Sequence, residues 1–262
     1  MAIAIADDET LGRLMRTVIH EIIDAEIFWR LHREVQIAAG TFRREVAQSR
    51  TFWSLTQQAL LDAVMFRLCK IYDQHRDALH LKSLLETIRA HRYRFGPARF
   101  RERMKDNPHL EFLMQGARAL DDQQLQRDLD YVSASTNPTV ETLVGLRHKF
   151  YAHRASREVV NATDLSQEYP LTKAQVTELL ARARELVNRY IQQFDANVYS
   201  AQIVGHDDYR TVIEAVHWDL ERRRTETHRQ SVRVDLRAAW EEVVRRTRED
   251  EAPPVRSERS QP

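Results

Sequence analysis

The sequence has few of the residues that tight turns and disulfides require. Its 262 residues include 6 glycines, 7 prolines and a single cysteine, Cys69. An all-β domain needs many tight turns, so the scarcity of glycine and proline favours long helices. One cysteine excludes an intramolecular disulfide and fits a reducing compartment.

The sequence also lacks an excess of either charge and any long apolar run. The 40 basic and 39 acidic residues give a formal net charge of +1, so any basic site for nucleic acid must be local. The apolar residues 1–6 are short and precede an acidic segment, which predicts no signal peptide. No apolar run approaches the roughly 20 residues that span a bilayer. We therefore expect a cytoplasmic protein with no membrane partner.

Apolar residues recur at helical spacing along most of the chain. Asn137-Pro138 is typical of a helix start, and Thr172 with Gln175 matches a capping box. Helices are predicted at about 9–38, 51–74, 80–91, 98–133, from 138 into the run 146–154, 172–198 and 207–249.

This pattern predicts an all-α fold, an antiparallel helical bundle with a C-terminal helical extension. We expect the bundle to cover residues 1–204 and the charged helical extension to cover residues 205–250. The polar residues 251–262 are expected to be disordered.

The run 146–154 holds the residues that best indicate a chemistry. Arg147 carries a permanent planar charge that matches phosphate oxygens, and His153 titrates near neutral pH and can move a proton. Arg147 also falls within the apolar stripe of Val140 and Leu143. A charge aimed at an apolar face needs an acidic partner or a cleft. Asp73, near the end of the second predicted helix, is our candidate partner.

Spacing alone does not bring Arg147 and His153 together. On a straight helix, six residues separate the two side chains by roughly 120°. They meet if the helix ends or bends between them, or if a twofold dimer places two copies of the run across one interface. The alternative is a helix end at which basic residues merely complement the helix dipole.

The run 146–154 resembles the motif of HEPN domains, which are helical proteins of prokaryotic toxins and antiviral systems. That motif is an arginine, a polar residue and, a few residues later, a histidine. Arg147, His148 and His153 occupy these three positions.

Further stretches resemble the abortive-infection, AbiU-type branch of these proteins. They are Phe52-Trp53, residues 68–73 and residues 79–85. The resemblance covers about residues 10–200, and residues 205–262 have no counterpart in it.

The resemblance implies a metal-independent endoribonuclease that acts as a homodimer without a cofactor, in phage defence or a toxin–antitoxin system. His153 would take a proton from a ribose 2′-OH or give one to the leaving oxygen. Arg147 would hold the scissile phosphate and stabilise its developing charge, and His148 would orient the pair or the phosphate by hydrogen bonding. Partners would be RNA and an antitoxin or regulatory protein. Some HEPN-like proteins are non-catalytic, so the alternative is a helical module that binds RNA, a nucleotide or a partner protein.

Additional RNA contacts are expected from the motif run and from a basic stretch at 92–105. In that stretch, aromatic residues alternate with cations, as in surfaces that stack bases and follow a phosphate backbone. The alternative, which we favour, is a solvated face anchored in the core by Phe95 and Phe100. The RNA-binding candidates are Lys149, Tyr151, Arg154, Arg99 and Arg101.

No metal site is expected. The histidines of the pairs 75/80 and 148/153 are five residues apart, whereas metal-binding pairs on one helix are usually four apart. There is also no glycine-rich phosphate loop and no Gly-x-Ser-x-Gly hydrolase motif.

Overall fold

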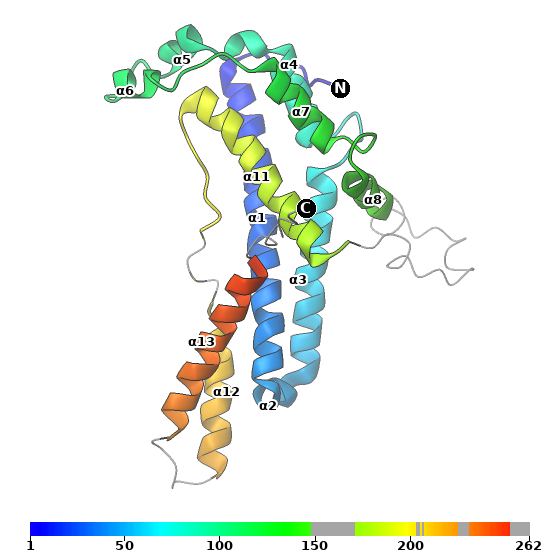
Figure 1. Ribbon diagram of the computed structural model, residues 1–262, viewed down its shortest axis with the longest axis vertical. Helices are drawn as coiled ribbons and strands as arrows, with labels where there is room; N and C mark the ends of the chain where they lie inside the picture. Colours follow the sequence, from blue (N-terminus) through cyan, green and yellow to red (C-terminus); the bar gives the residue numbers. More distant parts are fainter. Residues whose placement is uncertain (148–170, 203–204, 206, 225–230, 252–262) are drawn as a thin grey trace, which may run out of the picture. The chain divides into compact units, whose positions relative to one another are not determined.

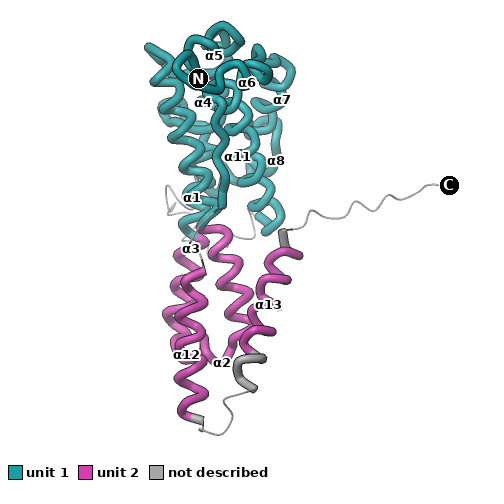
Figure 2. Tube along the Cα trace, turned by 90° about the vertical axis from the view of Figure 1, so that its left-hand side faces the viewer, with its two compact units in different colours: residues 1–27, 62–202 teal, residues 28–61, 203–262 magenta. Residues whose placement is uncertain are grey.

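The computed structural model describes residues 1–147, 171–202, 205, 207–224 and 231–251 (Figure 1). These residues form helices, and no strand occurs among them, which confirms the expected all-α fold. The chain divides into two compact units, residues 1–27 with 62–202 and residues 28–61 with 203–262 (Figure 2). We call them unit 1 and unit 2.

Four long helices, α1, α3, α11 and α13, and a series of shorter ones build the described chain. The helices are α1 (Asp8–Thr41), α2 (Arg43–Val46), α3 (Arg50–Ile71), α4 (Leu81–Ala90), α5 (Pro97–Arg103), α6 (Leu110–Met114), α7 (Asp122–Val132), α8 (Pro138–Leu146), α11 (Lys173–Asp195), α12 (Tyr209–Arg224) and α13 (Ser231–Glu251). Short 3-10 turns lie at Ala47–Ser49 and Arg92–Arg94. Helices α1 and α3 each contribute one part to unit 1 and the other part to unit 2.

In unit 1, the first part of α1, the second part of α3 and α11 lie side by side (Figures 1 and 2). Tyr72, which follows α3, donates its hydroxyl to the carbonyl of Leu179 on α11 at 2.8 Å. Apolar side chains at helical spacing fill the space between the helices because burial removes their surface from water. The largest fully buried side chains are Tyr72, Leu11, Met15, Ile19, Ile22, Leu68, Leu81, Leu84, Leu85, Ile88, Leu125 and Leu143.

Unit 2 packs α12 and α13 with α2 and the adjoining parts of α1 and α3. The Tyr209 and Trp240 rings lie 6.1 Å apart, whereas one straight helix would separate these residues by about 46 Å. The prediction of a single helix over 207–249 is therefore wrong, because two helices fold against each other. Their shared core consists of Val35, Ala38, Phe42, Trp53, Tyr209, Ile213, Leu236 and Val243.

The predicted helix starts at 137 and 172 are confirmed. The Asn137 side chain accepts a hydrogen bond from the Thr139 backbone N–H at 3.0 Å, ahead of a proline at the first helical position. Thr172 and Gln175 form the expected capping box at the start of α11. The continuous helix predicted over 98–133 is wrong, because three short helices, α5, α6 and α7, occupy this region.

Two further predictions concern membrane-spanning helices and the borders of the domains. Within the described part of the chain, none of the helices combines the length and apolarity needed to cross a membrane. The domain borders at residues 204 and 250 stay a prediction, and residues 252–262 of the expected disordered tail lie outside the described residues.

Candidate functional site

Arg147 stands at the end of α8. Val140 and Leu143 on this helix are fully buried, so the helix is fixed on the core by the stripe that the sequence indicated. Arg147 continues the helical backbone as the C-cap residue, with φ −56° and ψ −51°. Its side chain is 27% exposed, on a helix whose core-facing residues are buried.

A buried carboxylate holds the Arg147 guanidinium. Nη1 of Arg147 lies 2.9 Å from Oδ1 of Asp73, whose side chain is 8% exposed. The same oxygen accepts the backbone N–H groups of Gln74 at 2.7 Å and His75 at 3.0 Å. This turn after α3 therefore fixes the carboxylate, and the carboxylate fixes the arginine. The predicted pairing of Asp73 with Arg147 is confirmed.

The pairing leaves Arg147 with donors for a second anion. A guanidinium has five N–H donors in a rigid plane, and one terminal nitrogen faces Asp73. Among the described residues, Asp73 is the one ion-pair partner of Arg147, so the other donors can contact a phosphate oxygen unless residues outside the described part engage them. Chemically, the site is a positioned cation that can stabilise negative charge on a phosphate.

Cys69 packs beside this ion pair but has no reactive role. Its thiol is buried between α3 and α8 and points to the Leu143 carbonyl, with the sulfur 3.9 Å from the oxygen. Burial raises the pKa of Cys69 to about 12, against the smaller opposing effect of the Arg147 charge. The residue is therefore a neutral thiol at physiological pH and not a nucleophile.

His80 has a structural task at the start of α4. Its Nδ1 accepts from the Ser83 backbone N–H at 3.2 Å, and the His80 backbone N–H donates to Ser83 Oγ at 3.0 Å, which forms a capping box. With Nδ1 accepting, the proton is on Nε2, which lies 3.1 Å from the His75 carbonyl. Burial lowers the pKa of His80, so the ring is neutral near pH 7.

The other motif residues are His148, Lys149, Tyr151, His153 and Arg154. All five lie outside the described residues. Whether His153 approaches Arg147 through a bend in the chain or across a dimer interface therefore stays a prediction.

Arg99 and Arg101 lie on α5 and are exposed. Each already has a carboxylate partner, Glu102 for Arg99 and Glu111 for Arg101, both at 2.8 Å. Their contact with RNA stays a prediction. The neighbouring Phe95 and Phe100 are 5% and 3% exposed, which confirms that the aromatic residues of this stretch include core anchors.

Two further features of the described chain concern metal binding and a pocket in unit 1. No group of three or more potential metal-binding side chains occurs in the part that the structure describes. A pocket of about 530 Å³ in unit 1 includes Arg118, Arg189 and Gln193, which the sequence analysis did not select. No short motif links these residues, because they come from segments about 70 residues apart.

An all-helical fold with a positioned arginine at the end of a buried helix is the architecture expected of a HEPN domain. The sequence matches the AbiU2 family of HEPN domains over residues 8–215. The chain therefore belongs to the AbiU2 family, and its HEPN domain is related to abortive infection. No curated protein and no solved structure gives a significant match.

Proposed function

We propose that the protein is a metal-independent endoribonuclease of an abortive-infection or toxin–antitoxin system. The observation that carries the proposal is the Arg147–Asp73 pair, which holds a partly exposed guanidinium at the HEPN motif. Family membership supports the same function, because the run 146–154 lies within residues 8–215, which match a family related to abortive infection. RNA is the substrate, and a second copy of the chain completes the cleft.

In the proposed reaction, His153 takes the proton of a ribose 2′-OH. The 2′-oxygen then attacks the adjacent phosphorus, and the bond to the 5′-oxygen breaks as that oxygen takes a proton from water. Protonated His153 returns its proton to the solvent. Arg147 stabilises the additional negative charge on the phosphoryl oxygens, and His148 orients the phosphate by hydrogen bonding. The products are a 2′,3′-cyclic phosphate and a 5′-hydroxyl. DNA lacks the 2′-OH and is not cleaved.

Further cations and one aromatic residue are proposed to hold the RNA strand on both sides of the scissile phosphate. They are Lys149, Tyr151, Arg154, Arg99 and Arg101. Arg99 and Arg101 must exchange or share their carboxylate partners to do so, so we expect smaller effects from these two residues than from the motif run.

The test is cleavage of RNA and of DNA of the same sequence in EDTA. The wild type should cleave RNA to fragments that end in cyclic phosphate, and His153→Ala should abolish cleavage. Arg89→Ala is a matched control, since Arg89 is exposed and has no ion pair with another described residue. If wild-type protein and His153→Ala leave a diverse RNA pool equally intact, the enzyme proposal is wrong.

The Arg147 variant needs a separate design. Arg147→Ala would leave the buried Asp73 carboxylate without its counter-charge, so lost activity could reflect lost stability. Arg147→Lys keeps the charge but loses the planar fork. Arg147→Gln combined with Asp73→Asn removes both charges together. A catalytic role predicts that both variants fold and neither cleaves.

A non-catalytic binding module is the second candidate. The observation that favours it is the same ion pair, because a structural partner gives Arg147 a role without any chemistry. This function predicts that RNA or a regulatory protein binds without turnover. Expression in a host separates the two candidates, since an active toxin slows growth and His153→Ala relieves the effect.

A further inference from the structure

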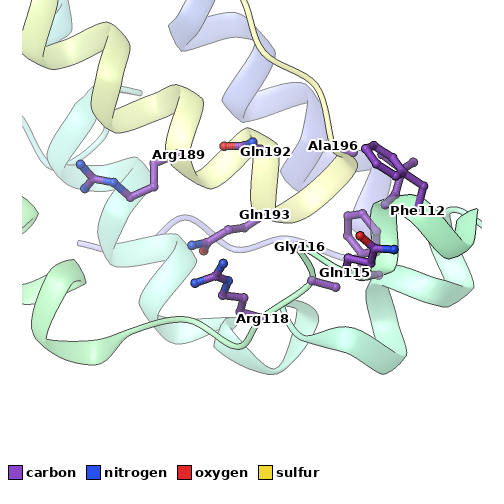
Figure 3. A pocket seen from close by; sticks show the side chains of 11 residues that line it. Phe112, Gln115, Gly116, Arg118, Arg189, Gln192, Gln193 and Ala196 are labelled. Atoms are coloured by element: carbon purple, nitrogen blue, oxygen red, sulfur yellow. The ribbon is translucent and has the colours of Figure 1, made fainter. Parts of the chain in front are cut away.

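A pocket of about 530 Å³ opens in unit 1, and Arg147 is not among the residues that line it. It lies among α5, α6, the segment that follows α6 and the C-terminal part of α11 (Figure 3). Helices α6 and α8 lie apart in both views of unit 1 (Figures 1 and 2). The volume is within the range of about 300–1,000 Å³ that is typical of small-molecule sites. The pocket is therefore large enough to bind a small molecule, and none of its lining residues belongs to the run 146–154.

One wall of the pocket is aromatic. Phe100 is buried and forms part of the fixed wall, whereas Phe112 on α6 is 71% exposed and still lines the pocket. A large exposed ring in a concavity is costly to leave in water. A planar ligand that stacks on Phe112 would cover this ring.

The two arginines of the pocket differ in what they already bind. Arg189 donates to the fully buried Asp128 and to Glu185 at 3.1 Å, so its charge is balanced within the fold. Arg118 is exposed and makes no ion pair or hydrogen bond with another residue of the described chain. Arg118 is therefore the cation available to an anionic group, and a phosphate suits its planar donors.

A third group calls for a hydrogen-bond donor. Oε1 of Gln193 is buried and has no partner within the described chain, and such an orphaned acceptor is costly. Figure 3 shows the Gln193 and Arg118 side chains pointing toward each other across the pocket. The C-terminal end of α11, where Gln193 lies, carries partial negative charge. This wall therefore favours donor groups, while the Arg118 side favours an anion.

We propose that this pocket binds a nucleotide unit. The base stacks on Phe112 and the phosphate contacts Arg118. The Gln193 side chain turns into the pocket, so that its Oε1 accepts from a donor on the base or ribose. The same chemistry occurs in a free nucleotide and in one nucleotide of a single-stranded RNA. The proposal goes beyond the ribonuclease function and does not depend on it, since none of these residues belongs to the HEPN motif.

The experiment measures binding of AMP by calorimetry and of a short single-stranded oligoadenylate by fluorescence anisotropy. Arg118→Ala should weaken binding by roughly tenfold, equivalent to about 1.4 kcal/mol. Phe112→Ala should weaken it at least about fivefold, as expected when a base loses its aromatic stack. Both side chains are exposed, so the variants should fold, and thermal unfolding checks this. Arg89→Ala is the control for loss of one positive charge.

Each outcome decides the proposal. Binding of AMP, of the oligonucleotide or of both supports it when Arg118→Ala and Phe112→Ala weaken binding and Arg89→Ala does not; AMP binding alone identifies a free nucleotide as the ligand. Absence of binding to both probes overturns it, as does equal weakening by Arg118→Ala and Arg89→Ala. None of these readouts measures RNA cleavage, so failure of the ribonuclease proposal remains distinguishable from failure of this one.

Discussion

Asp73→Asn removes the charge that balances Arg147 while it preserves the size of the side chain. In the wild type, Asp73 Oδ1 accepts from Arg147 and from the backbone N–H groups of Gln74 and His75. An asparagine oxygen can still accept from the two backbone groups. The substitution therefore acts mainly on the ion pair and leaves the turn after α3 in place.

The expected loss in the free energy of unfolding follows from how deeply Asp73 and Arg147 are buried. Breaking a buried ion pair by removal of one charge costs about 3–5 kcal/mol. Asp73 is 8% exposed but Arg147 is 27% exposed, so water can solvate part of the stranded guanidinium. We therefore expect Asp73→Asn to lower the free energy of unfolding by about 2 kcal/mol, between the values for buried and for exposed pairs.

A double-mutant cycle isolates the interaction. Asp73→Asn, Arg147→Met and the double variant are compared by urea unfolding, and the double variant should be more stable than the sum of the single losses predicts. We expect a coupling energy of about 1.5 kcal/mol or more, whereas exposed ion pairs give about 0.2–1 kcal/mol. A coupling below about 0.5 kcal/mol would show that Asp73 does not hold Arg147.

The same variant also tests whether Asp73 positions the arginine for chemistry. If Arg147 stabilises the transition state, folded Asp73→Asn should cleave RNA about 100-fold more slowly, the typical cost of a misplacement of about 1 Å. The assay is run well below the unfolding temperature, so that only the folded protein contributes.

Three other substitutions test the scaffold. Asp128→Asn should lower the free energy of unfolding by about 2–3 kcal/mol, because the fully buried carboxylate is the partner of Arg189 and of the Tyr190 hydroxyl; a loss below about 1 kcal/mol in urea unfolding would contradict this network. Ala196→Gly should raise the free energy of unfolding by about 0.5–1 kcal/mol, because Ala196 caps α11 with a left-handed φ of 58°. A lower melting temperature in calorimetry would contradict this. His80→Asn should flatten the pH dependence of stability below pH 6.5. Burial lowers the pKa of His80, so its contribution is complete above the unfolded pKa and is lost as the pH falls through the folded pKa. Parallel stability profiles of the two proteins would contradict the lowered pKa.

Local rules made the helix starts and the ion pair predictable. Asn137 and Thr172 act through hydrogen bonds to backbone groups two or three residues away, and these contacts are encoded by short spacing. The pairing of Arg147 with Asp73 followed from the cost of a charge within an apolar stripe. In each case, the cost of leaving a backbone group or a charge without a partner left few possible arrangements.

Two regions were harder to predict from the sequence, because the signals in them were weak or came from residues far apart in the chain. Residues 225–230 contain neither glycine nor proline, so the change from α12 to α13 carries no conventional break signal. The nucleotide pocket joins Phe112 and Arg118 to Gln193. No periodicity relates side chains so far apart, and only the packing of α11 against the α5–α6 region brings them together.

The ion pair also decides which experiment is informative about function. Arg147 is bound to a buried carboxylate, so loss of this arginine destabilises the fold in an enzyme and in a binding module alike. Activity lost in Arg147→Ala therefore cannot separate the two. Replacement of His153 leaves the Arg147–Asp73 pair in place and removes only the proposed proton acceptor. Only a catalytic function predicts that the wild type cleaves RNA while a folded His153→Ala variant binds RNA as tightly and does not cleave it.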